Sequence, residues 1–158
     1  MKYFKFLTFL SFLLLLTSCG GDDDICESGE GTPRMKVSFK SEQTGKTVTI
    51  DTLYVSVDYG SGKVDLGKTA NVESRLIPLR VDESSFTELY FKTRKDGNES
   101  KVKINYTTKN SYVSPGCGIK KSYENVVPEL LISNPVLGVE AGQNFIENED
   151  KTNLYLLF

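Results

Sequence analysis

The side chains of this sequence that could act in acid–base chemistry are mainly carboxylates, because the chain contains no histidine. That absence removes the usual general base, the Ser-His and Cys-His pairs, and the commonest metal ligand. A glycosidase needs only two carboxyl groups, held roughly 5 to 9.5 Å apart, and the candidates are Asp58, Asp65, Glu73 and Glu88. Any domain of this size offers as many carboxylates, and most of them are solvated surface charges. We therefore predict no catalytic residue and no enzyme activity, with a carboxylate-based hydrolase as an alternative.

The sequence also gives no reason to expect a cofactor or a metal. It contains no glycine-rich phosphate loop and no nucleophile elbow. The acidic runs at residues 22–24 and 147–150 lack the ligand spacing of a known calcium loop. We expect the cofactors and metals of this protein to be none.

The first of the three cysteines, Cys19, closes an N-terminal segment with the plan of a secretory signal. Lys2 and Lys5 precede an apolar run that is shorter than the roughly 20 residues of a membrane-spanning helix. The segment Leu16-Thr17-Ser18-Cys19 resembles the lipobox of bacterial lipoproteins. That resemblance implies cleavage before Cys19 and lipidation of its thiol, which holds the protein to a membrane. An ordinary cleaved signal with an incidental cysteine is the alternative.

The other two cysteines, Cys26 and Cys117, suffice for one disulfide, and an extracytoplasmic compartment permits it. The closed loop would hold about 90 residues, for which the chain-entropy model gives roughly 4 to 5 kcal/mol. Two free thiols are the alternative.

Three consecutive acids, Asp22, Asp23 and Asp24, follow the predicted lipidation site. An acidic run is repelled by an anionic lipid surface. This run resembles the export signal of surface lipoproteins in the Bacteroidota, which implies an outer-membrane protein displayed on the cell surface. A plain solvated tether, with the protein on the periplasmic face, is the alternative.

The triplet Asp51-Thr52-Leu53 resembles the O-glycan acceptor motif of extracytoplasmic proteins in the same group. It lies where we predict a bend in a strand, so the hydroxyl of Thr52 is a candidate for glycosylation.

The composition argues against nucleic acid as a partner. Removing residues 1–18 takes away two lysines and no acid, so the formal net charge of −2 becomes −4. Nucleic-acid-binding domains usually show a basic surface. The expected partners are the membrane, through the anchor, and an unknown protein or glycan.

From residue 34 onward the dominant period is two, which is typical of half-buried strands. Asp96-Gly97 between two such runs predicts a hairpin whose turn needs a positive φ. A further strand is predicted over residues 73–81, and Pro78 within it indicates a sheet edge or a bulge. Tyr54 and Tyr90 fall opposite the aliphatic faces of their strands and are expected to face solvent, where they could bind a partner or pair across strands. The clearest alternating sets are Met35, Val37, Phe39; Leu53, Val55, Val57; and Val102, Ile104, Tyr106.

These patterns predict an all-β fold with seven to nine strands, an antiparallel β-sandwich of the immunoglobulin-like, Greek-key type. An open barrel is the alternative. The expected organisation is a signal peptide over residues 1–18, a lipidated acidic and glycine-rich tether over 19–33, and a single sandwich domain over 34–158. We expect residues 154–158 to form the final core strand.

Across the mature chain the sequence resembles a small, uncharacterised lipoprotein family of the Bacteroidota. The resemblance rests on Cys26 before Thr32-Pro33-Arg34-Met35, on Ile77-Pro78-Leu79, and on Ser114-Pro115-Gly116-Cys117-Gly118. It implies a domain of unknown function and supplies no catalytic residues. The expected function is a non-enzymatic interaction module at the cell envelope, with a structural or adhesive surface subunit as an alternative.

Overall fold

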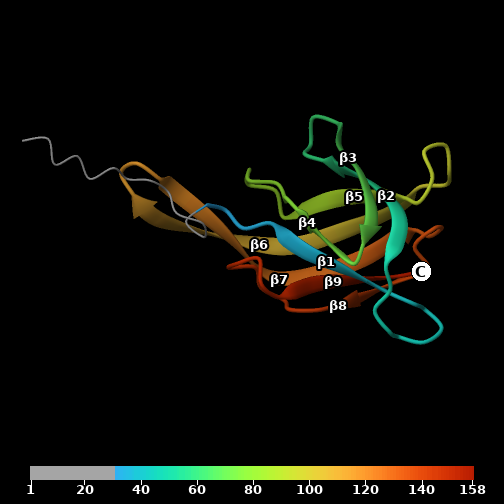
Figure 1. Ribbon diagram of the computed structural model, residues 1–158. Coiled ribbons are helices and arrows are strands. Elements are labelled where there is room, and N and C mark those ends of the chain that lie inside the picture. The colour runs from blue at the N-terminus through green and yellow to red at the C-terminus, as the bar shows by residue number, and fades with distance from the viewer. Residues whose placement is uncertain (1–30) are drawn as a thin grey trace, which may run out of the picture.

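The computed structural model describes residues 31–158, and within that range the chain forms two sheets of strands and no helix (Figure 1). The strands are β1 (Met35–Lys40), β2 (Ile50–Asp58), β3 (Lys63–Val72), β4 (Ser74–Ile77), β5 (Phe86–Lys92), β6 (Ser100–Ser114), β7 (Gly118–Ile132), β8 (Gly138–Ala141) and β9 (Thr152–Leu157).

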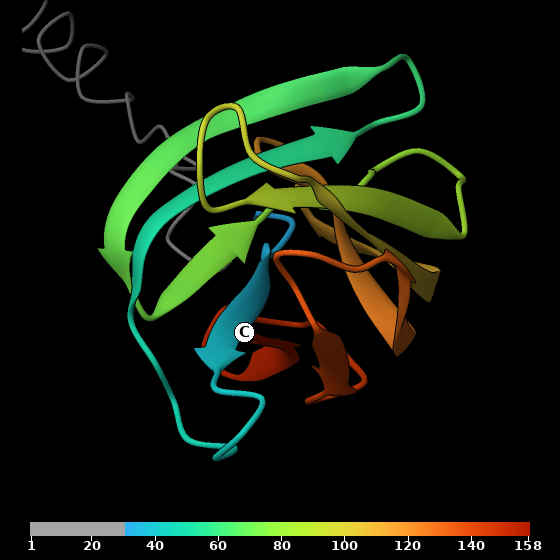
Figure 2. The ribbon, with the colours of Figure 1, turned by 90° about the vertical axis from the view of Figure 1, so that its right-hand side faces the viewer.

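The larger sheet is antiparallel throughout and has the order β3-β2-β5-β6-β7. The smaller sheet has the order β4-β1-β9-β8, in which β1 and β9 run parallel while the other two pairs are antiparallel. Figure 2 shows the larger sheet curving across the smaller one. The predicted all-β sandwich is confirmed. The parallel pair departs from a purely antiparallel arrangement, and it is possible because a long crossover connects its two strands.

The core lies between the two sheets and is built from the alternating apolar residues. In β1, Met35, Val37 and Phe39 are fully buried, and Leu154 and Leu156 of β9 pack into the same cluster. The predicted final core strand is therefore confirmed. The larger sheet contributes Leu53, Val55, Val57, Leu89, Phe91, Val102, Ile104 and Tyr106 from its inner face.

The hairpin predicted at Asp96-Gly97 joins β5 and β6, but its turn differs from the expected one. Phe91 and Ser100 are the last partners of the ladder, so a longer loop separates the strands. Gly97 does not adopt a positive φ. Instead its amide donates to the carbonyl oxygen of Arg94 at 3.1 Å, which closes a turn inside the loop.

The strand predicted over residues 73–81 is shorter than expected, since β4 ends at Ile77, directly before Pro78. Proline cannot donate to a ladder, which explains the end point. β4 lies at an edge of the smaller sheet, as predicted.

Candidate functional site

The hairpin of β6 and β7 extends beyond the sandwich. Both strands have 15 residues, whereas the next longest strand has 10. Tyr106 and Tyr123 mark the limit of the core, with buried rings in edge-to-face contact and centroids 5.0 Å apart. Between these two tyrosines, over residues 107–122, no residue is buried. Figure 1 shows this part of the hairpin projecting away from the other strands. We call residues 107–122 the hairpin tip.

An exposed apolar pair lies on the hairpin tip. Tyr112 and Ile119 are direct cross-strand partners, and they are 68% and 67% exposed. Because side chains alternate along a strand, Tyr112 lies on the same face of the hairpin as Tyr106. The face that forms the core thus continues past the core with no opposing sheet.

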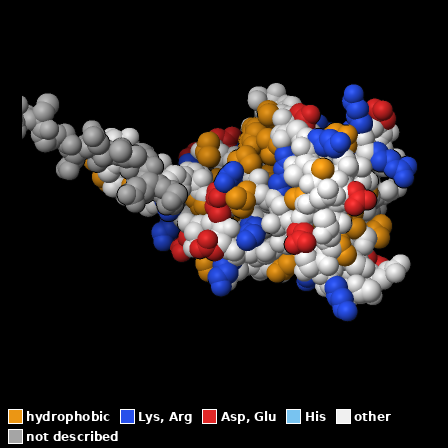
Figure 3. Space-filling model, in the orientation of Figure 1, with side chains coloured by type: hydrophobic (Ala, Val, Ile, Leu, Met, Phe, Trp, Pro, Cys, Tyr) orange, Lys and Arg blue, Asp and Glu red, His pale blue; other side chains and the backbone are white. Residues whose placement is uncertain are grey.

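The charge of the hairpin tip differs from that of the whole chain. The tip holds Lys109, Lys120 and Lys121 and no acidic residue, in a chain whose net charge is −2. The acidic partners of two of these lysines lie outside the tip, with Glu124 3.7 Å from Lys109 and Glu83 3.1 Å from Lys121. Over the sandwich face seen in Figure 3, basic and acidic side chains are interspersed.

The described chain enters the fold beside the hairpin tip. The backbone amide of Lys121 donates to the hydroxyl oxygen of Thr32 at 3.0 Å, and Pro33 is buried. Cys117 lies in the turn between β6 and β7, where its amide donates to the hydroxyl of Ser114 at 3.1 Å. The predicted sites at Cys19, Asp22, Asp23, Asp24 and Cys26 lie outside the described residues.

The outer face of the larger sheet carries a lysine–aromatic cluster around Tyr90. The ammonium groups of Lys63 and Lys101 lie 3.6 and 5.6 Å from the Tyr90 ring centroid, and the Tyr90 hydroxyl donates to Glu88 at 3.0 Å. Tyr90 is only 9% exposed, so the prediction that it faces solvent is wrong: the lysine stems cover its ring. Tyr54, opposite Lys92 on the same face, is half-buried.

Two of the four candidate carboxylates lie side by side. Asp58 and Glu88 are direct partners of the β2–β5 ladder. The hydrogen bond from Lys101 holds the pKa of Glu88 below its usual value, whereas the general acid of a glycosidase needs a raised pKa. The other two are bound elsewhere: Asp65 accepts from the amide of Gly67 at 2.8 Å, and Glu73 accepts from the hydroxyl of Thr49 at 3.1 Å.

Neither a metal cluster nor a spanning helix is found in the part of the chain that the structure describes. There, no three or more His, Cys, Asp and Glu residues are placed to hold a metal ion. No helix in residues 31–158 is long and apolar enough to cross a membrane.

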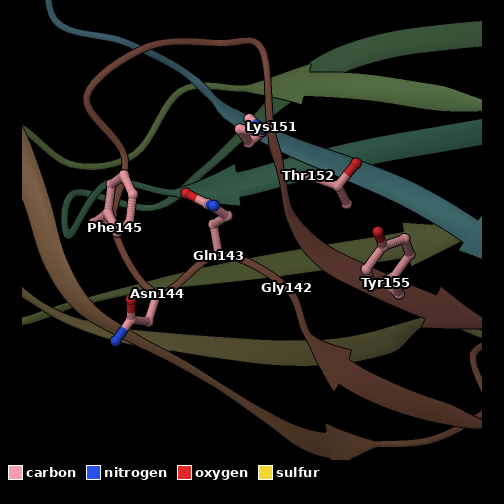
Figure 4. A pocket seen from close by; sticks show the side chains of 7 residues that line it. All are labelled: Gly142, Gln143, Asn144, Phe145, Lys151, Thr152 and Tyr155. Carbon is pink, nitrogen blue, oxygen red and sulfur yellow. The ribbon is translucent and has the colours of Figure 1, made fainter.

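A surface depression of about 660 Å³ lies between the end of β8 and the start of β9 (Figure 4). Its lining residues are Gly142, Gln143, Asn144, Phe145, Lys151, Thr152 and Tyr155. The side-chain oxygen of Gln143 is buried there without a hydrogen-bond partner. The amide and aromatic groups are suited to contacts with a polar ligand, and no acidic residue lines the depression.

Thr52 lies within β2 rather than at a bend, since Ile50 pairs with Val72 and Thr52 with Ala70 in one continuous ladder. Its side chain is half-buried. It lines a shallow depression with Thr93 and Arg94 of the β5–β6 loop, so the acceptor hydroxyl is at the surface of a strand.

Sequence reasoning did not single out Tyr112 or Ile119. The available signal was an acid-free run with apolar residues on both sides of Ser114-Pro115-Gly116-Cys117-Gly118.

Comparison with known families decides the relationship of this chain. Residues 47–158 match a family described as a family of unknown function, DUF6452. The chain belongs to DUF6452. The DUF6452 match spans β2 to β9, while β1 lies before it. No curated protein and no solved structure matches this DUF6452 chain.

Proposed function

We propose that this protein is a lipid-anchored protein of the bacterial outer membrane and a non-enzymatic binding module at the cell surface. In this proposal Cys19 carries the lipid, and Asp22, Asp23 and Asp24 direct export. The protein is one of the lipoproteins of the Bacteroidota. Its partners are the membrane and a protein or glycan of the envelope.

The observation that carries the proposal is the hydrogen bond between Lys121 and Thr32, which fixes where the N-terminal segment meets the fold. From Cys19 to Thr32 the chain reaches at most about 45 Å, at 3.3 to 3.6 Å per residue. An anchor at Cys19 would therefore keep the hairpin end of the sandwich near the membrane. The opposite end, where β5 joins β6 and β7 leads to β8, would point away from it.

A disulfide between Cys26 and Cys117 is part of the proposal. It is supported by the Thr32–Lys121 contact and by the short spacings in the sequence, since Cys26 precedes Thr32 by six residues and Cys117 precedes Lys121 by four. Such a bond would shorten the free tether to residues 20–25, about 20 Å in reach.

The binding surface that we propose lies on β7 and in the loop after it. Val127, Leu131, Ile132 and Leu137 are between 42% and 56% exposed there, at the edge of the larger sheet. Apolar side chains gathered at a surface indicate a protein interface. We therefore favour a protein partner, while the depression at Gln143 keeps a glycan as the second candidate.

The non-enzymatic part of the proposal rests on the state of the carboxylates. The chain has no histidine, and Glu88, the carboxylate with a close acidic neighbour, is bound by Lys101 at 2.8 Å and kept ionised.

The test has two arms in the native host. Palmitate labelling and membrane fractionation are compared between the natural chain and Cys19→Ala. We expect the variant to carry no palmitate label and to be absent from the membrane fraction. A photo-crosslinking residue at Leu131 should trap a protein that the same residue at Val64, exposed on β3, does not trap. Unchanged fractionation of Cys19→Ala contradicts the anchor. Hydrolysis of a glycan that Glu88→Gln abolishes contradicts the non-enzymatic role.

A further inference from the structure

We propose that the hairpin tip is a membrane-contact surface, with Tyr112 and Ile119 seated at the lipid–water interface. This inference rests on the lipid anchor of the proposed function. It adds a second, non-covalent contact between the protein and the bilayer, made by the fold itself.

The first argument is the chemistry of the exposed pair. Tyr112 and Ile119 are the two most exposed large hydrophobic side chains of the described residues, and they face each other across the hairpin. Tyrosine has an apolar ring and a polar hydroxyl, which suit it to the interface between headgroups and acyl chains. Within the described residues about two thirds of each side chain, 68% for Tyr112 and 67% for Ile119, is exposed and available for such a contact.

The second argument is charge. The hairpin tip holds three lysines and no acid. Lysine side chains near an anionic lipid surface are attracted to it. Glu124 of β7 contacts Lys109, and Glu83 of the loop before β5 contacts Lys121, which also donates to the carbonyl oxygen of Asp82 at 3.2 Å. Lys109 and Lys121 thus lie in ion pairs at the base of the tip, and the exposed apolar pair lies nearer its end.

The third argument is placement. The projecting hairpin and the point where the described chain begins lie at the same end of the molecule (Figure 1). Thr32 touches Lys121, inside the tip itself. A chain anchored through residues before Thr32 therefore presents the tip, rather than another surface, to the bilayer. A protein partner at this end would have to compete with the membrane for the same exposed pair.

The natural chain contains no tryptophan, which makes a single-tryptophan test possible. Tyr112→Trp places the probe in the tip, and Ile119→Trp repeats the measurement from the other strand. Lys95→Trp is the matched control, because Lys95 is exposed in the loop between β5 and β6, at the end of the sandwich opposite the tip. All three positions are at the surface, so the fold should tolerate each change.

The full lipidated chain is purified in detergent and reconstituted into phosphatidylcholine–phosphatidylglycerol vesicles, with and without brominated acyl chains. We expect the emission of both tip probes to shift to shorter wavelength and to be quenched by bromine, and the emission of Lys95→Trp to be unaffected. Protein that floats with the vesicles while the tip probes are unquenched, or quenched no more than the control, overturns the inference and leaves the anchor standing. Protein that does not float overturns the anchor and, with it, this inference.

Discussion

Arg34 and Glu149 form a two-point ion pair across 115 positions of the sequence. The guanidinium Nε and Nη2 atoms donate to the two carboxylate oxygens at 2.7 and 2.8 Å, and the backbone amide of Arg34 donates as well, at 3.1 Å. The pair ties the residue before β1 to the loop before β9.

Glu149→Gln should lower the free energy of unfolding at neutral pH by about 0.5–1 kcal/mol, the range for a well-oriented surface pair. The hydrogen bond from Arg34 holds the pKa of Glu149 below its usual value. The stabilising effect is therefore present above the unfolded-state pKa, near 4.3, and is lost as the pH falls through the folded-state pKa. Urea unfolding at pH 7 and at low pH measures it. A difference that persists in acid, or one matched by Glu147→Gln, contradicts the assignment.

Tyr123→Phe should cost about 1 kcal/mol, because it removes the hydrogen bond from the Tyr123 hydroxyl to the carbonyl oxygen of Arg80 at 3.1 Å while keeping the ring against Tyr106. Tyr123→Ala should cost about 3–5 kcal/mol, because it also leaves a cavity at the base of the hairpin. Chemical denaturation of both variants checks that Tyr123→Ala loses more free energy of unfolding than Tyr123→Phe. Equal losses would mean that the ring contributes nothing beyond its hydroxyl.

Alkaline pH should destabilise the protein through the same residue. Burial raises the pKa of Tyr123 well above its usual value. The resulting stabilisation is complete below pH ~10, where tyrosine is neutral in both states, and is lost as the pH rises toward the folded-state pKa. The melting temperature should fall less steeply with pH in Tyr123→Phe than in the natural chain. The measurement covers pH 9 to pH 12, about the range over which free tyrosine ionises. Parallel curves for the two proteins would contradict the prediction.

Cys117→Ala should reduce the free energy of unfolding by up to about 4–5 kcal/mol if Cys26 and Cys117 are joined, since the closed loop is about 90 residues long. Mass analysis without reduction should show the mature protein two hydrogens lighter than its reduced form. Recovery of two alkylatable thiols before reduction would exclude the bond. The stability of the reduced natural chain should equal that of the variant.

Thr52 should carry a glycan when the protein is made in its native host. The expected result is an added mass on the intact protein that is absent from Thr52→Ala. Thr69→Ala is the matched control, because Thr69 is also a half-buried threonine of this ladder, on the neighbouring edge strand β3. An unmodified mass for the natural chain would mean that Thr52 is not a glycan acceptor.

The sequence predicted the strands whose apolar residues alternate, because burial on one face of a sheet imposes that period. Met35, Val37 and Phe39 are the clearest case, and all three are fully buried. β3 was not predicted. Only Val72 of its ten residues is buried, since it is an edge strand with both faces largely in water.

The hairpin tip was missed for a related reason. Residues 107–111 are Thr, Thr, Lys, Asn and Ser, which carry no apolar alternation. Their strand exists because backbone ladder bonds to β7 continue past the core, from Thr107 opposite Glu124 to Tyr112 opposite Ile119. Apolar periodicity reveals a strand only when one of its faces is buried, and no residue of the hairpin tip is buried. The register that aligns Tyr112 with Ile119 depends on the extra residue in β7 near Asn125, which adopts a positive φ of 55°.

The parallel pairing of β1 with β9 bears on when the sandwich can close during synthesis. Lys36 and Asn153, which join the two strands, are 117 positions apart. β1 is the first of the described strands to be synthesised, yet its ladder with β9 cannot form until β9 has been made. Pairings between such distant segments form slowly. The smaller sheet therefore cannot close until the last residues of β9 have been synthesised, so an incomplete chain cannot hold the two sheets together.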